Sequence, residues 1–259
     1  MVSKRKSAEQ AFQLFCTPFL KSKKKIHPES AESVQFKLQK LTINGYRWNY
    51  PQPNKVLILH GFGSAGHKFE HYVAPLVEKG YEVLAFDAPA HGESDGKTTH
   101  AIEYSEMIKK VMDEYGPVKN FIAHSFGGIA LSLALEEMPH DAGTKIVFIA
   151  PATETTSAVD GAFHMLKIKD REVREEFEKI IVEVSGKETA WFSMRRAMHH
   201  IRAKILWIHD EEDDITPWND AEKVKEDNHS NINFVITKGL GHRKIYHDAA
   251  VKNKVINFL

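Results

Sequence analysis

A serine at a strand-to-helix junction is the first place where this sequence could carry out chemistry. Residues 121–123 read as a buried strand, Ser125 follows in the run Ala-His-Ser-Phe-Gly-Gly, and residues 129–134 read as a helix. A serine on such a sharp turn leaves little room for neighbours, which fits the small residues Ala123 and Gly127. The N-terminus of the helix would direct partial positive charge toward an oxyanion formed there. The pattern predicts a nucleophilic serine, and a plain strand-to-helix turn is its structural alternative.

Three further segments place small or polar residues directly after apolar runs. Residues 60–64 read His-Gly-Phe-Gly-Ser, residues 86–94 read Phe-Asp-Ala-Pro-Ala-His-Gly-Glu-Ser, and residues 238–242 read Lys-Gly-Leu-Gly-His. The glycines before His242 would let that loop approach a serine closely. Active sites of mostly parallel sheets lie beyond the carboxyl ends of the strands. We therefore expect these loops to meet around Ser125.

Together these segments resemble the α/β-hydrolase superfamily, in particular its serine hydrolases of the esterase and lipase type. The His-Gly-Phe-Gly-Ser loop, the D-x-P-x-H-G-x-S segment and the serine turn follow one another in the family's order and at family-like spacing. The resemblance spans roughly residues 34–259, and Ala123 departs from it because the family usually has glycine there. It implies that Ser125 is the nucleophile and that His242 is its general base.

The same resemblance assigns the remaining parts of the site. It implies that the backbone amides of Phe62 and Phe126 form the oxyanion hole. Residues 209–217 resemble the family's acid loop, and aligning the histidine and the proline of that loop places the acid at Asp213. The chain order of serine, acid and histidine then matches the family order. Three other carboxylates stay open as the acid: Asp210, which stands where glycine is usual, its neighbour Asp214, and Glu154, which follows the preceding strand.

Short apolar runs alternate with helical patterns along most of the chain. The runs are residues 56–59, 83–86, 121–123, 146–149, 205–208 and 234–236, and the helical patterns are residues 67–79, 99–115, 127–138, 218–227 and 243–259. Such alternation predicts an α/β fold with a mostly parallel sheet and helices on both faces. Residues 33–50 predict a hairpin of antiparallel edge strands with a tight turn at Asn44-Gly45. With the resemblance, the expectation is an α/β-hydrolase fold of about eight strands.

The spacing of the runs also predicts how the chain is divided. Residues 1–32 form a helical, basic extension, and residues 33–152 and 202–259 form the core. Residues 153–201 separate two strands by far more than a crossover needs, so we expect a helical lid, with a long two-helix crossover as the alternative. Trp191 and Phe192 of this stretch are candidate substrate contacts. Four further side chains are either anion-binding groups or a solvated helix face: Arg195, Arg196, His199 and His200.

Composition narrows the class of partner and the location. Lysine plus arginine equals aspartate plus glutamate at 35 each, so no global field favours nucleic acid or an anionic membrane surface. The single cysteine, Cys16, favours a reducing, cytoplasmic compartment. The apolar run at residues 11–20 is too short to span a bilayer, and the basic residues 21–25 follow it, so no integral membrane association is expected. We expect a helix that docks Phe12, Phe15 and Phe19 on the protein, with a membrane-surface anchor as the alternative.

The function expected from this site is carboxylesterase-like hydrolysis of an ester, or a related acyl bond, of a small and largely apolar substrate. This chemistry needs no cofactor and no metal. The alternatives are a non-catalytic binding protein, or another reaction of the fold such as that of a thioesterase, peroxidase, carbon–carbon hydrolase, lyase or aminopeptidase. Residues 67–71 also spell H-x-x-E-H, a zinc-enzyme motif, although no further acidic ligand is evident.

Overall fold

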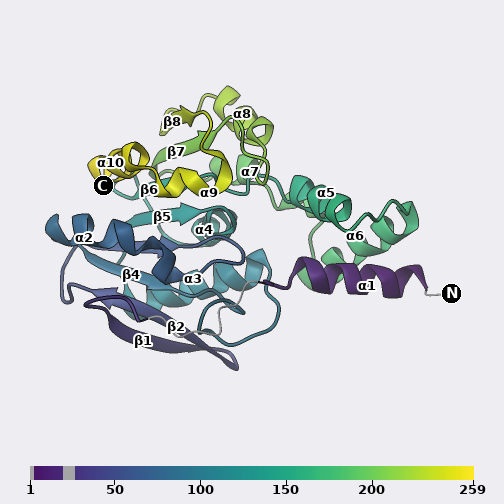
Figure 1. Ribbon diagram of the computed structural model, residues 1–259, viewed down its shortest axis with the longest axis horizontal. Coiled ribbons are helices and arrows are strands. Elements are labelled where there is room, and N and C mark those ends of the chain that lie inside the picture. Colours follow the sequence, from purple (N-terminus) through teal and green to yellow (C-terminus); the bar gives the residue numbers. More distant parts are fainter. Residues whose placement is uncertain (1–2, 20–26) are drawn as a thin grey trace.

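The apolar runs form the strands of a single eight-stranded sheet (Figure 1). The computed structural model describes residues 3–19 and 27–259. The strand order is β1-β2-β4-β3-β5-β6-β7-β8, with β2 antiparallel to both of its neighbours and all other pairs parallel. The strands are β1 (Glu32–Leu38), β2 (Leu41–Trp48), β3 (Lys55–Leu59), β4 (Glu82–Phe86), β5 (Asn120–His124), β6 (Lys145–Ile149), β7 (Lys204–Asp210) and β8 (Ile232–Thr237).

Helices cover both faces of the sheet because successive strand side chains point to opposite faces. In β3, Val56 and Ile58 enter one core layer, whereas Leu57 and Leu59 enter the other. The first layer is closed by α2 (Glu70–Glu78) and α10 (Ala249–Phe258). The second is closed by α3 (Ala101–Tyr115), α4 (Phe126–Glu137), α7 (Met194–Met198) and α8 (Trp218–Glu226). The predicted fold class is therefore confirmed.

The N-terminal hairpin lies at one edge of the sheet, but its turn is not where the sequence predicts it. Leu38 pairs with Leu41, so the turn is formed by Gln39 and Lys40, and Asn44-Gly45 lies inside β2. Gly45 is needed there for a different reason, because a Cβ at this position would lie 2.3 Å from Cδ1 of Phe86 on the adjacent strand. The Asn-Gly pair therefore marks a close approach of two strands and not a turn.

The last predicted helix is also divided. Residues 241–259 form α9 (Gly241–Lys244), a 3-10 turn η3 (Ile245–His247) and then α10. Asp248 leaves the helical conformation and caps α10, because its side chain accepts a hydrogen bond from the amide of Val251. An aspartate at this position starts a new helix and breaks the continuous pattern.

Residues 153–201, hereafter the insertion, leave the sheet after β6 and return before β7. They form α5 (Thr155–Met165), α6 (Arg171–Ser185), a 3-10 turn η2 (Thr189–Trp191) and α7. A bridge between Glu154 and Ser193 joins the two ends of the insertion, and the Ser193 hydroxyl lies 2.7 Å from a Glu154 carboxylate oxygen. The insertion is therefore closed at its base, and α5 and α6 project beside the sheet (Figure 1).

The N-terminal helix α1 (Lys4–Phe15) packs on the insertion and not on the sheet (Figure 1). The rings of Phe12 and Phe15 lie 5.6 and 5.8 Å from the ring of Phe177 on α6. Phe19 is 67% exposed, so the expectation that it docks is wrong. The basic residues 21–25 lie outside the described residues. Within the described ranges, none of the helices combines the length and the apolar character needed to cross a bilayer.

Two fully enclosed histidines sit at the carboxyl ends of β3 and β5. His60 Nε2 accepts the Ala88 amide at 3.0 Å, so its proton is on Nδ1, which lies 2.8 Å from the Gly61 carbonyl. Burial lowers the pKa of His60 from 6.5 to about 4. Burial, together with the nearby His242, lowers the pKa of His124 to about 3. Both imidazoles therefore stay neutral in the folded protein at pH values where they are protonated in the unfolded chain.

This difference predicts that the free energy of unfolding falls in mild acid. Because the unfolded state binds more protons than the folded state between the two pKa values, each histidine removes stability as the pH drops below about 6.5. Each should remove about 2 kcal/mol between pH 7 and pH 5. Urea unfolding at both pH values should show this loss, and His124→Gln should reduce it by about 2 kcal/mol. The exposed His164 provides a control, since His164→Gln should retain the full loss; an unchanged loss in His124→Gln would contradict the assignment.

Candidate active site

Ser125 stands between β5 and α4 in a strained backbone conformation. Its φ is 53° and its ψ is −119°, which is a region that L-residues rarely occupy. The turn is crowded, since a Cβ at Gly127 would lie 2.7 Å from the Leu59 carbonyl oxygen and a Cβ at Gly128 would lie 2.6 Å from Pro151. Glycine is therefore the residue that fits at these two positions, and Ala123 at the end of β5 is fully buried. The turn thus holds the hydroxyl at the carboxyl edge of the sheet.

His242 meets this serine from the loop after β8. Its Nε2 lies 3.0 Å from Ser125 Oγ. Gly239 and Gly241 before it both have positive φ angles, 84° and 56°, so glycine is the residue that suits the backbone there. His242 is 8% exposed and Ser125 is 7% exposed, so the hydrogen bond between them is largely shielded from solvent.

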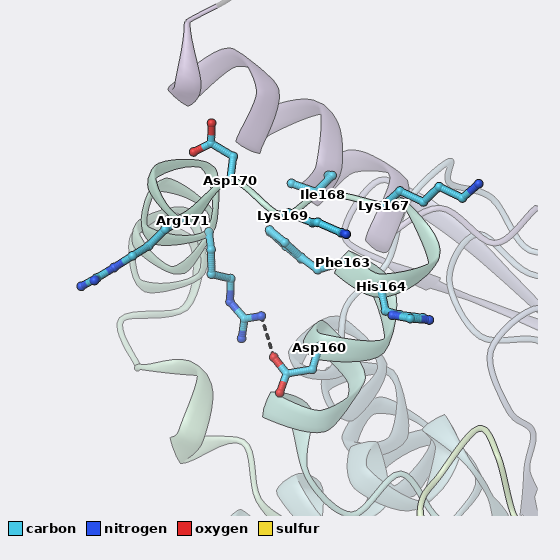
Figure 2. A pocket seen from close by; sticks show the side chains of 9 residues that line it. Asp160, Phe163, His164, Lys167, Ile168, Lys169, Asp170 and Arg171 are labelled. Atoms are coloured by element: carbon cyan, nitrogen blue, oxygen red, sulfur yellow. Dashed lines mark hydrogen bonds and ion pairs between the residues drawn. The ribbon is translucent and has the colours of Figure 1, made fainter.

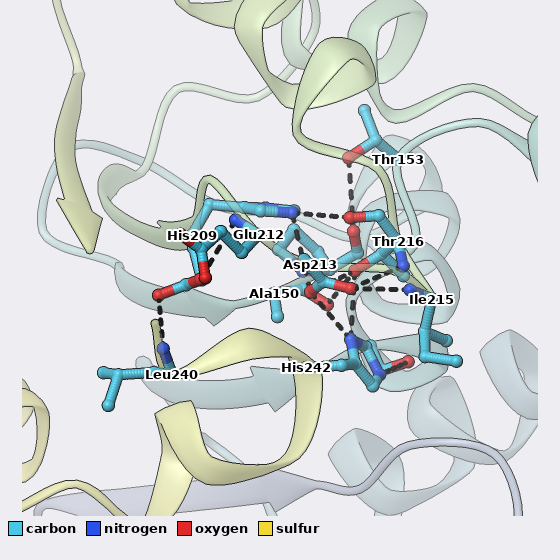
Figure 3. A network of polar contacts seen from close by, with 12 residues as sticks. Ala150, Thr153, His209, Glu212, Asp213, Ile215, Thr216, Leu240 and His242 are labelled. Carbon is cyan, nitrogen blue, oxygen red and sulfur yellow. Dashed lines mark hydrogen bonds and ion pairs between the residues drawn. The ribbon is translucent and has the colours of Figure 1, made fainter. Parts of the chain in front are cut away.

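Asp213 lies behind the histidine, and the other three candidate acids do not. Asp213 Oδ2 is 2.9 Å from His242 Nδ1 (Figure 3). Glu154 instead binds Ser193 at the base of the insertion, and Asp214 is exposed. The structure therefore brings together Ser125, His242 and Asp213 in one line of hydrogen bonds, in the order that the sequence predicts.

Backbone amides keep the Asp213 carboxylate charged in its buried position. Burial alone raises the pKa of Asp213, but the hydrogen bond and charge of His242 and the amides of Thr216 and Ile215 outweigh it, and the net pKa is below the ordinary value. The amides donate to Oδ1 at 2.8 and 2.9 Å. An ionised carboxylate at Nδ1 holds the proton of the imidazole on that nitrogen and leaves Nε2 free to accept the serine proton.

Asp210 supports the histidine loop and not the imidazole. Its Oδ2 accepts hydrogen bonds from the Thr237 hydroxyl at 2.7 Å and the Leu240 amide at 3.0 Å. Burial raises the pKa of Asp210, and these bonds, with those from the amides of Gly241 and Glu212, lower it overall. The carboxylate that replaces the usual glycine therefore ties the end of β7 to the loop that carries His242.

Sequence reasoning missed one polar partner of the acid. The Thr216 hydroxyl lies 2.9 Å from Asp213 Oδ2 and 3.1 Å from His242 Nδ1 (Figure 3). His209 is fully buried, and its Nε2 lies 2.8 Å from the Thr216 carbonyl oxygen. The signal for Thr216 was present, because an aspartate followed three residues later by a threonine is typical of a side-chain-capped turn.

The loop with residues 60–64 approaches the serine from β3. A Cβ at Gly61 would lie 2.9 Å from Ser125 Cβ, so glycine permits this approach. His91 holds the loop, since its Nε2 accepts the Gly63 amide at 2.9 Å. His91 therefore supports the loop from the segment after β4.

The side chains of Phe62 and Phe126, whose amides are the candidate oxyanion donors, lie side by side. Their ring centroids are 5.5 Å apart in an edge-to-face arrangement, and Phe62 is 40% exposed. The amide of Phe126 is the first of α4, and the first amides of a helix have no partner within the helix. The two rings therefore form an apolar surface next to Ser125.

Trp191 and Phe192, the candidate substrate contacts, pack within the protein. The Arg196 guanidinium lies 3.9 Å from the Trp191 ring centroid and forms an ion pair with Glu136 near the end of α4. Phe192 is 5% exposed. The other candidate anion-binding arginine, Arg195, is paired with Asp227 at 2.7 Å. Both arginine charges are thus matched by carboxylates of the same chain.

The side chains of the H-x-x-E-H segment bind different partners and do not form one metal site. Glu70 accepts the Glu29 amide at 2.9 Å, and His71 Nε2 lies 2.7 Å from the Tyr246 carbonyl oxygen. The described residues do contain a group of three metal-type donors, and neither these two residues nor His67 belong to it.

A cavity of about 590 Å³ lies in the insertion, between α5 and α6. Figure 2 shows Phe163 and Ile168 at its wall among charged side chains. Arg174, which also lines the cavity, donates to Asp160 at 2.6 Å. None of its lining residues comes from the loops around Ser125. The cavity is therefore separate from the candidate active site.

Comparison with known proteins agrees with this architecture. The sequence model of the α/β hydrolase fold family matches residues 54–179. An uncharacterized hydrolase, YugF of Bacillus subtilis, is 33% identical over 102 residues, which are 37% of this chain and 37% of YugF. A 2-hydroxy-6-oxo-6-phenylhexa-2,4-dienoate hydrolase of Delftia acidovorans is 31% identical over 104 residues, 37% of this chain and 36% of that enzyme. The chain thus matches little more than a third of the length of these curated relatives.

Solved structures share the fold over nearly the whole chain. The Pyrococcus furiosus esterase Pf2001 superposes with a TM-score of 0.68 at 21% identity, covering 94% of this chain and 97% of the esterase. The thioesterase domain from the curacin biosynthetic pathway superposes with a TM-score of 0.63 at 14% identity, covering 88% of this chain and 100% of that domain. At such identities the likeness concerns the fold. The family match and the shared sheet show that this chain has the α/β-hydrolase fold.

Proposed function

We propose that the protein is a serine hydrolase that cleaves a carboxylic ester of a small, largely apolar substrate through an acyl-enzyme. The observation that supports this proposal is the continuous relay from Ser125 Oγ through His242 to Asp213, with bonds of 3.0 and 2.9 Å. A relay of this geometry activates a hydroxyl for attack on a carbonyl carbon.

In the first half of the proposed reaction, His242 Nε2 takes the proton of Ser125 as Oγ bonds to the ester carbonyl carbon. The carbonyl electrons move onto oxygen, and the amides of Phe62 and Phe126 donate to this oxyanion. When the oxyanion collapses, the bond to the alcohol oxygen breaks and the imidazolium returns its proton to that oxygen. The acyl group is then bonded to Ser125.

In the second half, water replaces the alcohol. His242 takes a proton from the water as its oxygen attacks the acyl carbon, and the collapse of the second oxyanion returns the electrons and the proton to Ser125. The products are a carboxylic acid and the free enzyme. Asp213 stays ionised throughout and stabilises the imidazolium, which agrees with the lowered pKa of its carboxyl.

Several features around the relay support the substrate class. The rings of Phe62 and Phe126 offer an apolar wall beside the nucleophile, and the two arginines of the insertion already have carboxylate partners. We further propose that the insertion acts as a lid, since it leaves the sheet from the carboxyl end of β6, the edge that holds Ser125. Trp191 packs against Arg196 and Phe192 is buried, so neither is proposed as a substrate contact. The cytoplasmic location stays a prediction that rests on the single cysteine.

Replacing the nucleophile tests the proposal directly. Ser125→Ala should lower kcat on p-nitrophenyl esters by on the order of 10⁶-fold, because the acyl-enzyme cannot form. The same change should abolish labelling by a fluorophosphonate probe. Turnover of the acetate, butyrate and octanoate esters, and of a matched thioester, shows which acyl chain length and which bond the protein prefers.

The control is Ser132→Ala, a buried serine two turns further along α4 whose hydroxyl donates to the Ile129 carbonyl at 2.8 Å. It should keep both labelling and turnover. Labelling of Ser125→Ala at the wild-type rate, or a wild-type protein that neither reacts with the probe nor turns over any ester, would exclude the serine hydrolase.

A second pair of variants tests the acid. Asp213→Asn should lower kcat by about 10⁴-fold, because an amide cannot hold the imidazole in the required tautomer or stabilise its charge. Its exposed neighbour offers a matched comparison, and Asp214→Asn should keep turnover within about twofold of wild type. Equal losses in the two variants would show that Asp213 is not the acid of the relay. The assay is steady-state hydrolysis at pH 7.5 by proteins with the same circular dichroism spectrum.

A further inference from the structure

Three side chains that can bind a metal converge at a place remote from Ser125. His199 follows α7, whereas Asp227 and His229 follow α8. One donor atom from each lies within 4.8 Å of the other two. The centroids of the two imidazole rings are 5.0 Å apart, and the ring planes meet at 67°. Among the described residues, this is the one group of three such side chains whose donor atoms lie this close together.

The sheet topology separates this group from the candidate active site. His199 precedes β7, and Asp227 and His229 precede β8, so the group lies toward the amino ends of those strands. Ser125 follows the carboxyl end of β5. Because these strands are parallel, the two sites lie at opposite ends of the strands, one beyond the amino ends and the other beyond the carboxyl ends. An ion bound by the group would therefore not take part in the chemistry at Ser125.

One of the three side chains has a ring nitrogen without a hydrogen-bond partner among the described residues. This atom is His229 Nε2, which is buried. A buried polar atom left in this state costs about 1–3 kcal/mol. A ligand at the centre of the group would remove this cost.

Asp227 can bind an ion while keeping its present partner. Its two oxygens accept the Arg195 guanidinium at 2.7 Å each, and each carboxylate oxygen has a second lone pair. The Arg195 side chain is 44% exposed and that of Asp227 is 18% exposed, so water screens the repulsion between the guanidinium and a nearby cation. The ion pair holds the carboxylate in place, with one of its oxygens within 4.8 Å of a donor atom of each imidazole.

We propose that His199, Asp227 and His229 form a binding site for a divalent transition metal ion of the Zn²⁺ class. Two imidazoles and one carboxylate suit this class, whereas Ca²⁺ and Mg²⁺ select oxygen ligands. In a tetrahedral site, ligand bonds of about 2.0–2.2 Å place the donor atoms about 3.4 Å apart. Donor atoms that now lie within 4.8 Å of one another therefore need to close by at most about 1.4 Å. His199 is exposed at the end of α7 and can make this movement. Water fills the remaining positions of the ion.

Bound metal would join two segments that are far apart in sequence. His199 belongs to the return of the insertion toward β7, and the other two ligands lie in the connection between α8 and β8. Since the unfolded chain does not present the three donors together, metal binding should stabilise the folded protein. The role we infer is a clip at the amino edge of the sheet.

Zn²⁺ titration of the purified chain tests the site. Isothermal calorimetry in a buffer that does not bind zinc should show one equivalent bound by the wild type. His199→Ala and His229→Ala should each weaken binding by at least about tenfold. Zn²⁺ should also raise the urea midpoint of the wild type and leave that of His199→Ala unchanged.

The neighbouring histidine supplies a matched control. His200 is exposed and adjacent to His199 but lies outside the group, so His200→Ala should bind Zn²⁺ like the wild type. Because His199 is exposed, its alanine variant should fold even where His229→Ala does not. Equal affinity in the wild type and His199→Ala, or no stoichiometric binding by the wild type, would overturn the proposal.

Discussion

The hydrogen bond between Ser125 and His242 is the interaction on which the rest of the site depends. The two residues are 117 positions apart, and their side-chain atoms lie 3.0 Å from one another. Two contacts fix the histidine side of this bond. Asp210 holds the loop through the Leu240 amide, and His124 Nε2 lies 3.2 Å from the main-chain oxygen of His242. The residue directly before the serine thus contacts the main chain of the residue that activates it.

Buried polar groups around this bond divide into two carboxylates, Asp213 and Asp210, and several neutral groups. Asp213 accepts two amides and a hydroxyl besides the imidazole, so its charge is compensated although water is excluded. His60 and His124 remain neutral because burial lowers the pKa of each. A second cation next to His242 would oppose the imidazolium that forms during turnover. The neutral histidines avoid this repulsion while still supporting the loops.

Sequence patterns predicted the parts of the structure that depend on local chemistry. Continuous apolar runs located the strands, and the small residues around Ser125 predicted its turn because no larger side chain fits there. The predicted position of the hairpin turn was wrong. Asn44-Gly45 is a common turn signal, but glycine is needed here because the Phe86 ring on a neighbouring strand lies close to it. The sequence did not indicate which surface α1 packs against, since apolar residues on a helix predict burial without naming the partner. The His199, Asp227 and His229 group could not be seen because its members lie in two loops that only the folded sheet brings together.

The two edges of the sheet carry different kinds of site for a common reason. At the carboxyl ends of the strands, the loops can adopt strained conformations because the sheet supports them. The positive φ of Ser125 is an example. At the amino ends, the loops lead into the strands and must place them in register. Asn231, just before β8, does so by donating hydrogen bonds to the Ile201 and Ala203 carbonyls. That contact already links the segment after α7 to the segment after α8. A metal clip between His199 and His229 would reinforce the same link, which is why we assign it to stability and leave the chemistry to the opposite edge.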